Sequence, residues 1–325
     1  MVTIPTRLTK FFDIQHPIIS APMALAAGGA LAGAVSRAGG LGLLGGAYAV
    51  DDWIETQWRE AGNADIGCGF ITWKLKQALV EQPDLLDQVL ARKPKALFLS
   101  FDDPHPLSNT IRDAGVPLVV QVQTLRDAKR AMDCGADVIV AQGAEGGGHG
   151  ERRATMTIVP EVADEVARTN SNAILCAAGG IADGRGLAAA LMLGAEGVVM
   201  GSRLWASEEA IVHPAMLEAA ITATGDDTIR SSVMDIARTL EWPDRYTARV
   251  LKNAFTERWH DDLDGLIANA EAESTRWKQA WVDGEVTTAN TFVGEATGMI
   301  SGVRPAANLI EETVMQASAL LKRYA

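Results

Sequence analysis

The first 200 residues alternate short apolar runs with amphipathic stretches, and this alternation restricts the possible folds strongly. The apolar runs are predicted as eight strands, at 18–21, 41–44, 66–71, 96–100, 118–122, 138–141, 174–177 and 197–200. Strands that are apolar along their whole length are buried on both faces, as in parallel sheets. Eight strand–helix units over about 200 residues fit a closed (β/α)8 barrel, or TIM barrel. An open doubly wound sheet is the alternative.

The stretches between the predicted strands have the apolar spacing of helices. The first stretch ends near residue 38, and the others lie at 50–60, 75–90, 107–114, 125–134, 159–169 and 184–193. A last helix is predicted at 307–321, where it would pack on the barrel wall.

The pattern changes at residue 208. From there to about residue 290 the sequence has no clear strand signal, and Trp242, Trp259, Trp277 and Trp281 fall in this segment. Apolar residues recur at helical spacing in 216–221, 246–255 and 263–281. We therefore predict that 1–207 and 291–325 form the barrel and that 208–290 is a helical insertion covering its mouth. The Trp and Leu side chains of the insertion could form its own core or the face of a homodimer.

Composition excludes several classes of function. A chain of 325 residues that is 48% hydrophobic can bury a large core, and it has no uncharged apolar run long enough for a membrane helix. Its first residues lack the features of a signal peptide. The net charge of −12 argues against nucleic acid and anionic membranes as partners. Cys68, Cys134 and Cys176 have no metal-binding spacing and indicate a reduced, cytoplasmic protein.

The segment 138–149, VIVAQGAEGGGH, combines a buried strand with a polar, glycine-rich loop. Ligands of α/β proteins bind beyond the carboxyl ends of parallel strands, so Gln142, Glu145 and His149 are candidate site residues. The glycines at 146–148 can adopt positive φ and let the backbone lie close to a planar ligand. Glu145 could orient His149 or face solvent. The alternative is a plain flexible loop.

A second glycine pattern follows the next two predicted strands. The seventh strand ends in AAGGIADG at 177–184, and the eighth ends in Val199, Met200, Gly201 and Ser202. The loops after strands seven and eight of such barrels commonly bind phosphate through backbone N–H groups and the start of a short helix. These turns therefore predict a phosphate-bearing ligand. The glycines could instead serve only tight turns.

These segments resemble the nitronate monooxygenase family, formerly called 2-nitropropane dioxygenases. The resemblance rests on AQGAEGGGHG at 141–150, on AAGGIADGRGLAAALMLGAEGVVMGSRL at 177–204, on APMA at 21–24 and on 119–124 with Gln121. It spans residues 15 to about 215. It implies an FMN-dependent (β/α)8 enzyme related to the flavin-dependent enoyl-ACP reductases.

The resemblance also implies roles for individual residues. Pro22, Met23 and Ala24 would line the flavin ring, while Gln142 and Gly147 would contact FMN. Gly180 and the run from Val199 to Ser202 would hold the phosphate. The same site would include Gln121, Gly148, Gly179, Met200 and Gly201. After the third strand, family members often carry an asparagine that binds the flavin, whereas this chain has Gly69, which offers only its backbone.

His149 is the expected catalytic residue. In the family, a histidine at this place removes the α-proton of a neutral nitroalkane, and an imidazole suits that task near neutral pH. With an anionic nitronate it would only bind the nitro group. The implied reaction oxidises a small alkyl nitronate with O2 to a carbonyl compound and nitrite.

Other functions on this scaffold stay open. One is an NADH- or NADPH-dependent reductase of an enoyl thioester or quinone, which needs no dinucleotide fingerprint on this fold. Another is a flavin- or phosphate-binding protein without catalysis. Aldolases are less favoured, because no lysine lies at the predicted carboxyl ends of strands six to eight.

Overall fold

The computed structural model describes residues 2–47 and 51–323, and its largest unit is a barrel of eight parallel strands. The strands follow the order β1-β9-β8-β6-β5-β4-β3-β2, and a parallel bridge between Ile19 and Leu41 joins the two ends of this sheet. The predicted (β/α)8 fold is therefore confirmed. The strands are β1 (Ile18–Ser20), β2 (Leu43–Ala47), β3 (Gly67–Ile71), β4 (Leu97–Ser100), β5 (Leu118–Val122), β6 (Val138–Gln142), β8 (Ile174–Ala178) and β9 (Gly197–Met200).

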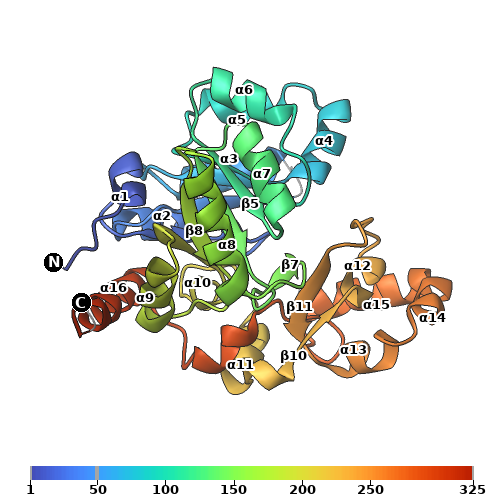
Figure 1. The fold of residues 1–325 in the computed structure, drawn as a ribbon. Coiled ribbons are helices and arrows are strands. Elements are labelled where there is room, and N and C mark those ends of the chain that lie inside the picture. Colours follow the sequence, from blue (N-terminus) through green and yellow to red (C-terminus); the bar gives the residue numbers. More distant parts are fainter. Residues whose placement is uncertain (1, 48–50, 324–325) are drawn as a thin grey trace.

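Helices surround the barrel, and the two chain ends lie on the same side of it (Figure 1). The helices are α1 (Arg7–Phe12), α2 (Gly29–Arg37), α3 (Asp51–Glu60), α4 (Thr72–Glu81), α5 (Leu85–Ala91), α6 (Leu107–Asp113), α7 (Leu125–Asp133), α8 (Thr155–Arg168), α9 (Gly184–Met192), α10 (Ser202–Trp205) and α16 (Ala306–Arg323). Val50, where one helix was predicted to begin, lies outside the described residues. Among the described ranges, no helix is long and apolar enough to cross a membrane.

The single helix predicted at 75–90 is wrong, because two helices occupy this stretch. Helix α4 ends before Gln82, whose φ of −128° and ψ of 74° are not helical. Gln82 precedes Pro83, and the proline ring disfavours helical geometry for the residue before it. Helix α5 then starts at Leu85.

Side chains of the strands alternate between two buried layers. Val119 belongs to the cluster inside the barrel, whereas Val120 belongs to the layer between strands and helices. Leu8 and Phe12 of α1 join the inner cluster and close the end of the barrel where the strands begin. The opposite end, where the strands finish, is left for the remaining segments to cover.

Residues 208–290, which we call the cap segment, contain strands as well as helices. Its elements are α11 (Pro214–Thr222), η1 (Gly225–Asp227), β10 (Thr228–Ser231), α12 (Val233–Ala237), β11 (Thr247–Leu251), α13 (Ala254–Trp259), α14 (Leu263–Ala268) and α15 (Ala270–Asp283), and η2 (Glu295–Met299) follows it. Strands β10 and β11 pair antiparallel, and β11 pairs with β7 (Gly148–Gly150). Figure 1 shows β7 reaching from the barrel to this small sheet.

The expectation of an all-helical insertion is therefore wrong. The apolar positions of 246–255 fit helical spacing, but Ala248 and Val250 pack in one apolar cluster and Leu251 packs in another, as successive residues of a strand point to opposite faces. The partner that fixes β11 as a strand lies in the glycine-rich loop, about a hundred residues earlier in the chain. Pairing at that distance leaves no local signal.

Candidate active site

A cavity of about 740 Å³ lies at the carboxyl ends of the barrel strands, between the barrel and the cap segment. The structure brings almost all of the predicted site residues together around it. They are Pro22, Met23, Ala24, Gly69, Gln121, Gln142, Gly147, Gly148, His149, Gly179, Gly180, Val199, Gly201 and Ser202. The cap segment contributes Ala210, Ile211, Val212, His213, Met216, Arg238, Trp242, Trp277 and Trp281.

Met200 is the exception among the predicted residues. Its side chain is fully buried in the layer between strands and helices, whereas Val199 faces the inside of the barrel. Successive residues of a strand point to opposite faces, so only one of this pair can reach the cavity. The backbone oxygen of Met200 accepts a hydrogen bond from the N–H of Ala21, 2.9 Å away. Val199, and not Met200, is placed to contact a ligand.

Glycines shape the barrel side of the cavity. Gly180, after β8, has a φ of 70°, and a Cβ there would lie 3.2 Å from the Cβ of Glu145. Gly69, in β3, is restricted differently, because a Cβ there would lie 2.4 Å from the ring of Pro22. A contact that short would displace Pro22 from the cavity wall. An asparagine side chain at position 69 therefore does not fit beside Pro22.

Amide side chains hold the start of the glycine-rich loop. The Oε1 of Gln142 accepts hydrogen bonds from the Nε2 of Gln121 at 2.7 Å and the Nε2 of Gln123 at 2.8 Å. The Nε2 of Gln142 donates to the backbone oxygen of His149 at 3.2 Å. This network fixes the orientation of Gln142 and, through it, the backbone that carries the imidazole.

His149 lies on β7 and pairs with Asp235 of α12. Its Nε2 is 3.0 Å and 2.9 Å from the two carboxylate oxygens, and Asp235 is 3% exposed. Nε2 is therefore the atom that carries a proton toward the carboxylate. Nδ1 makes no hydrogen bond within the described part of the chain. This nitrogen is left to accept a proton from a ligand in the cavity.

The indole of Trp242 covers one face of His149. The ring centroids are 3.4 Å apart and the planes differ by 6°, which is a stacked arrangement. Burial lowers the pKa of His149 below its ordinary value of 6.5, and the hydrogen bond to Asp235 opposes this shift. The imidazole is therefore neutral and able to act as a base at neutral pH.

Phe101 completes the aromatic surroundings of His149. Its ring meets His149, Trp242 and Tyr246 edge-on, at centroid distances of 6.2, 5.1 and 5.3 Å. Phe101 has a φ of 63°, which is strained for a residue with a Cβ. Strained backbone that persists at a cavity is typical of a functional site.

The family can be decided from the whole sequence. The family model for nitronate monooxygenase matches residues 5–64 and 73–316. The chain belongs to the nitronate monooxygenase family. It is 31% identical to a nitronate monooxygenase of Neurospora crassa, over 98% of this chain and 94% of that protein. It is 35% identical to the nitronate monooxygenase npaC of Metarhizium robertsii, over 94% and 91% of the two chains.

A solved structure shows the same fold. FabK from Thermotoga maritima superposes with a TM-score of 0.86 at 30% identity and covers 99% of both chains. Membership makes the chain an oxidoreductase of a flavin-dependent family with a TIM barrel. The resemblance inferred from the sequence motifs is therefore confirmed.

Several residues around this nitronate monooxygenase-type site were not found from the sequence. Asp235 lies in a segment without a motif, although Trp242 belongs to a region noted for its tryptophans. Arg238 also lines the cavity, and its guanidinium lies 5.8 Å from the ring centroid of Trp277 and 5.7 Å from that of Phe292. Asp235, Trp242 and Arg238 come from the cap segment, whose contacts with the cavity the sequence does not predict residue by residue.

Two arginines of the cap sheet hold the loop that carries His149. Arg230 donates to the backbone oxygens of Ala144 at 3.1 Å and Gly150 at 2.6 Å, and Arg249 donates to that of Ala144 at 3.0 Å. The two arginines face each other across β10 and β11. Burial lowers the pKa of Arg230 to about 10, which still leaves it charged at neutral pH. The cap sheet thus fixes both ends of the loop.

Glu145 has a role that neither sequence-based alternative described. Its carboxylate accepts hydrogen bonds from the backbone N–H of Thr155 at 3.0 Å and from the hydroxyl of Thr155 at 2.8 Å. Thr155 begins α8, so Glu145 caps that helix. It does not orient His149, which depends on Asp235 instead.

Proposed function

We propose that this protein uses FMN to oxidise small alkyl nitronates with O2, giving a carbonyl compound and nitrite. The observation that carries the proposal is the pair of His149 and Asp235, with Nδ1 of His149 available at a cavity formed by the strand ends. The family of the chain supports the same reaction.

The barrel side of the cavity suits a phosphate-bearing planar cofactor. Gly148 has a φ of 72° and a Cβ position with nothing within 4 Å, so its backbone borders open space. We propose that the glycines after β8 and β9, together with Ser202, hold the phosphate through backbone N–H groups. The backbone of 22–24 and the amides of Gln121 and Gln142 would face the ring. When bound, the flavin supplies the electron-accepting centre between substrate and O2.

His149 is proposed as the base for neutral nitroalkanes. Nδ1 takes the α-proton, and the resulting positive charge on the ring is balanced by the carboxylate of Asp235 at 2.9 Å. A nitronate arrives already deprotonated, so with that substrate the imidazole binds and orients the nitro group. The lowered pKa of His149 keeps this base neutral over most of the physiological pH range.

Residues 208–290 are proposed as the part that encloses the substrate. Trp242, Trp277 and Trp281 form an apolar wall opposite the glycine-rich surface, which excludes water from the reacting atoms. The barrel would hold the cofactor, and the cap segment would hold the substrate and complete the base.

Anaerobic mixing tests the proposal. The protein should be yellow, should release FMN and not FAD on denaturation, and should lose visible flavin absorbance quickly on mixing with propyl-2-nitronate. NADH and NADPH, mixed in parallel, should react slowly or not at all. Fast bleaching by the nicotinamides with indifference to nitronate would instead establish a reductase. A colourless protein that FMN cannot reconstitute would remove the flavin from the proposal.

His149→Ala separates the two roles of the imidazole. Turnover of neutral nitroethane should fall by at least about 100-fold, because no other group would be placed to take the proton. Turnover of ethylnitronate should be retained to a large extent. An equal loss on both substrates would contradict a base role and leave only substrate binding.

A further inference from the structure

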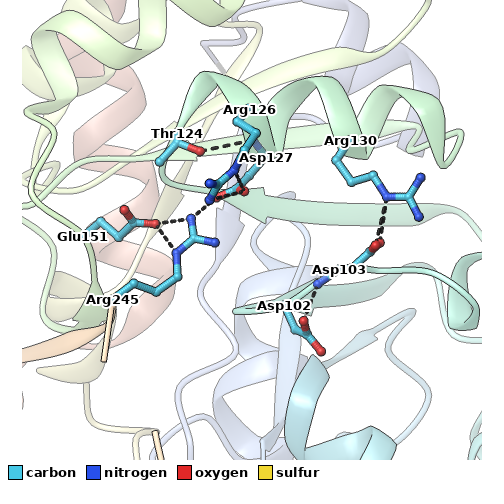
Figure 2. Close-up of polar contacts among 8 residues, drawn as sticks. All are labelled: Asp102, Asp103, Thr124, Arg126, Asp127, Arg130, Glu151 and Arg245. Carbon is cyan, nitrogen blue, oxygen red and sulfur yellow. Dashed lines mark hydrogen bonds and ion pairs between the residues drawn. The ribbon is translucent and has the colours of Figure 1, made fainter. Parts of the chain in front are cut away.

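An ion-pair bridge joins the cap segment to the barrel beside His149. Figure 2 shows Arg245 reaching from the chain between α12 and β11 toward two carboxylates on the barrel side. Its Nε is 2.9 Å from Oε1 of Glu151, and its guanidinium also pairs with Asp127. Asp127 lies in the first turn of α7, and Glu151 directly follows β7.

Arg245 stands at the end of the short loop 240–246, which carries the ring that covers His149. Trp242 stacks on the imidazole at 3.4 Å, and Tyr246 packs against Phe101. Trp242 and Tyr246 are 9% and 4% exposed, and they share one apolar cluster with Ile71 of the barrel. The guanidinium of Arg245 also lies 5.0 Å from the ring centroid of Tyr246. The bridge and the stacking ring therefore belong to one packed unit.

We propose that Arg245 is a positioning residue for proton transfer, because its bridge to Asp127 and Glu151 holds the loop 240–246 so that Trp242 covers His149. This inference rests on the proposed role of His149 as base. Arg245 itself does not line the cavity. It acts through Trp242, whose stacking fixes the plane of the imidazole and keeps water from that face.

Charge explains why one arginine can hold two elements. Asp127 and Glu151 are 24% and 18% exposed in their side chains, so both carboxylates keep part of their charge away from water. A guanidinium presents several N–H donors in one plane and can pair with both carboxylates in a fixed geometry, whereas the ammonium of a lysine lacks this planar arrangement. Burial lowers the pKa of Arg245, but its hydrogen bonds to Asp127 and Glu151 raise it overall, so the guanidinium stays charged.

The groups facing His149 define what the bridge changes. The charged groups are Asp235 of α12, Arg238 after α12 and Arg230 of β10. Tyr246 is also nearby, but it stays neutral because burial raises its pKa to about 12. All of them remain when Arg245 is replaced. Loss of the bridge should therefore act on His149 through the burial of the imidazole under Trp242, beside the effect of leaving the nearby carboxylate of Glu151 without this cation. Water reaching the ring raises the pKa of His149 toward 6.5.

The test is Arg245→Gln in the flavin-loaded protein. With neutral nitroethane, kcat should fall about 10-fold or more, and the acid limb of the kcat profile should move to higher pH. With ethylnitronate, kcat and flavin content should stay close to wild type. Arg245→Lys should restore the function only in part. Arg130→Gln is the matched control. Arg130 lies in α7, as Asp127 does, but its ion pair is with Asp103 of the barrel and not with the cap segment (Figure 2).

Three further measurements keep the test decisive. Glu151→Gln should give a smaller shift in the same direction, and added salt should lower nitroethane turnover in wild type but not in Arg245→Gln, because salt screens the exposed part of the bridge. An NMR titration of the His149 ring reports the pKa without any substrate. A variant with unchanged pKa and unchanged nitroethane kinetics overturns the inference, as does equal loss on both substrates with loss of flavin. Absence of turnover in wild type would refute the proposed function instead. The NMR titration would still test whether Arg245 affects the pKa of His149.

Discussion

The barrel and the cap segment contribute to the site in different ways. The barrel provides glycines and amides at the ends of consecutive strands, where the fold itself brings them together. The cap segment provides Asp235 from α12 and both Trp242 and Arg245 from the loop 240–246. Asp235 and Trp242 contact His149, and we propose that Arg245 acts through Trp242. In the proposed function, cofactor binding follows from barrel topology, whereas the cap sets the properties of the base.

The largest effect is expected on the barrel side, from Gly180→Val. A valine at a φ of 70° is strained, and its Cβ would lie 3.2 Å from the Cβ of Glu145, in the turn where we propose that the phosphate binds. The protein should lose its flavin and with it all activity. Gly115→Val is the control, because Gly115 has a φ of 69° with nothing within 4 Å of its Cβ position and is not among the residues lining the cavity. Full flavin content in Gly180→Val would place the phosphate site elsewhere.

A cap substitution, Asp235→Asn, should leave the flavin bound and still slow the reaction. The amide cannot balance an imidazolium, so the pKa of His149 should fall further below 6.5 and the base should weaken. Turnover of nitroethane should drop about 100-fold, with its acid limb moved to lower pH, opposite in direction to Arg245→Gln. Asp262→Asn serves as the control, because it removes only a charge at the start of α14 and the asparagine can still accept the capping hydrogen bond. If flavin were lost as well, the division between barrel and cap would not hold.

The smallest effect is expected from Glu145→Gln. Glu145 lies in the same loop as His149, but its hydrogen bonds go to the start of α8. Removing its charge should lower the free energy of unfolding by about 1 kcal/mol, measured by denaturant titration. The pH profile of nitroethane turnover should not move. A moved profile would mean that this carboxylate also acts on the base.

The sequence was sufficient for the barrel because its signals are local. Each strand is a short apolar run such as 138–142, and the glycines at 179–180 and 201 mark the turns that follow two of them. A parallel barrel then fixes which ends meet. Within the barrel, the sequence-based predictions differ from the structure at Met200 and at Gln82, and they do not include α1 or β7.

The cap could not be predicted in the same way because its contacts are distant in sequence. His149 and Asp235 are 86 positions apart, and nothing in the residues around Asp235 distinguishes it from a surface aspartate. Local spacing predicts a helix at β11, because the partner that makes it a strand, β7, lies inside a loop of the barrel. The residues that tune His149 become visible only when the two segments are placed together.

Strand β7 has a consequence for any attempt to exchange caps between relatives. It is continuous in sequence with the barrel, yet its hydrogen-bonding partner is β11 of the cap segment. A chimera that replaces 208–290 alone would pair a foreign β11 with the native β7. It would also replace Arg230 and Arg249, which donate to backbone oxygens of the native loop. The transplantable unit therefore consists of two pieces of chain, the loop 143–151 and the cap segment, and a functional exchange has to move them together.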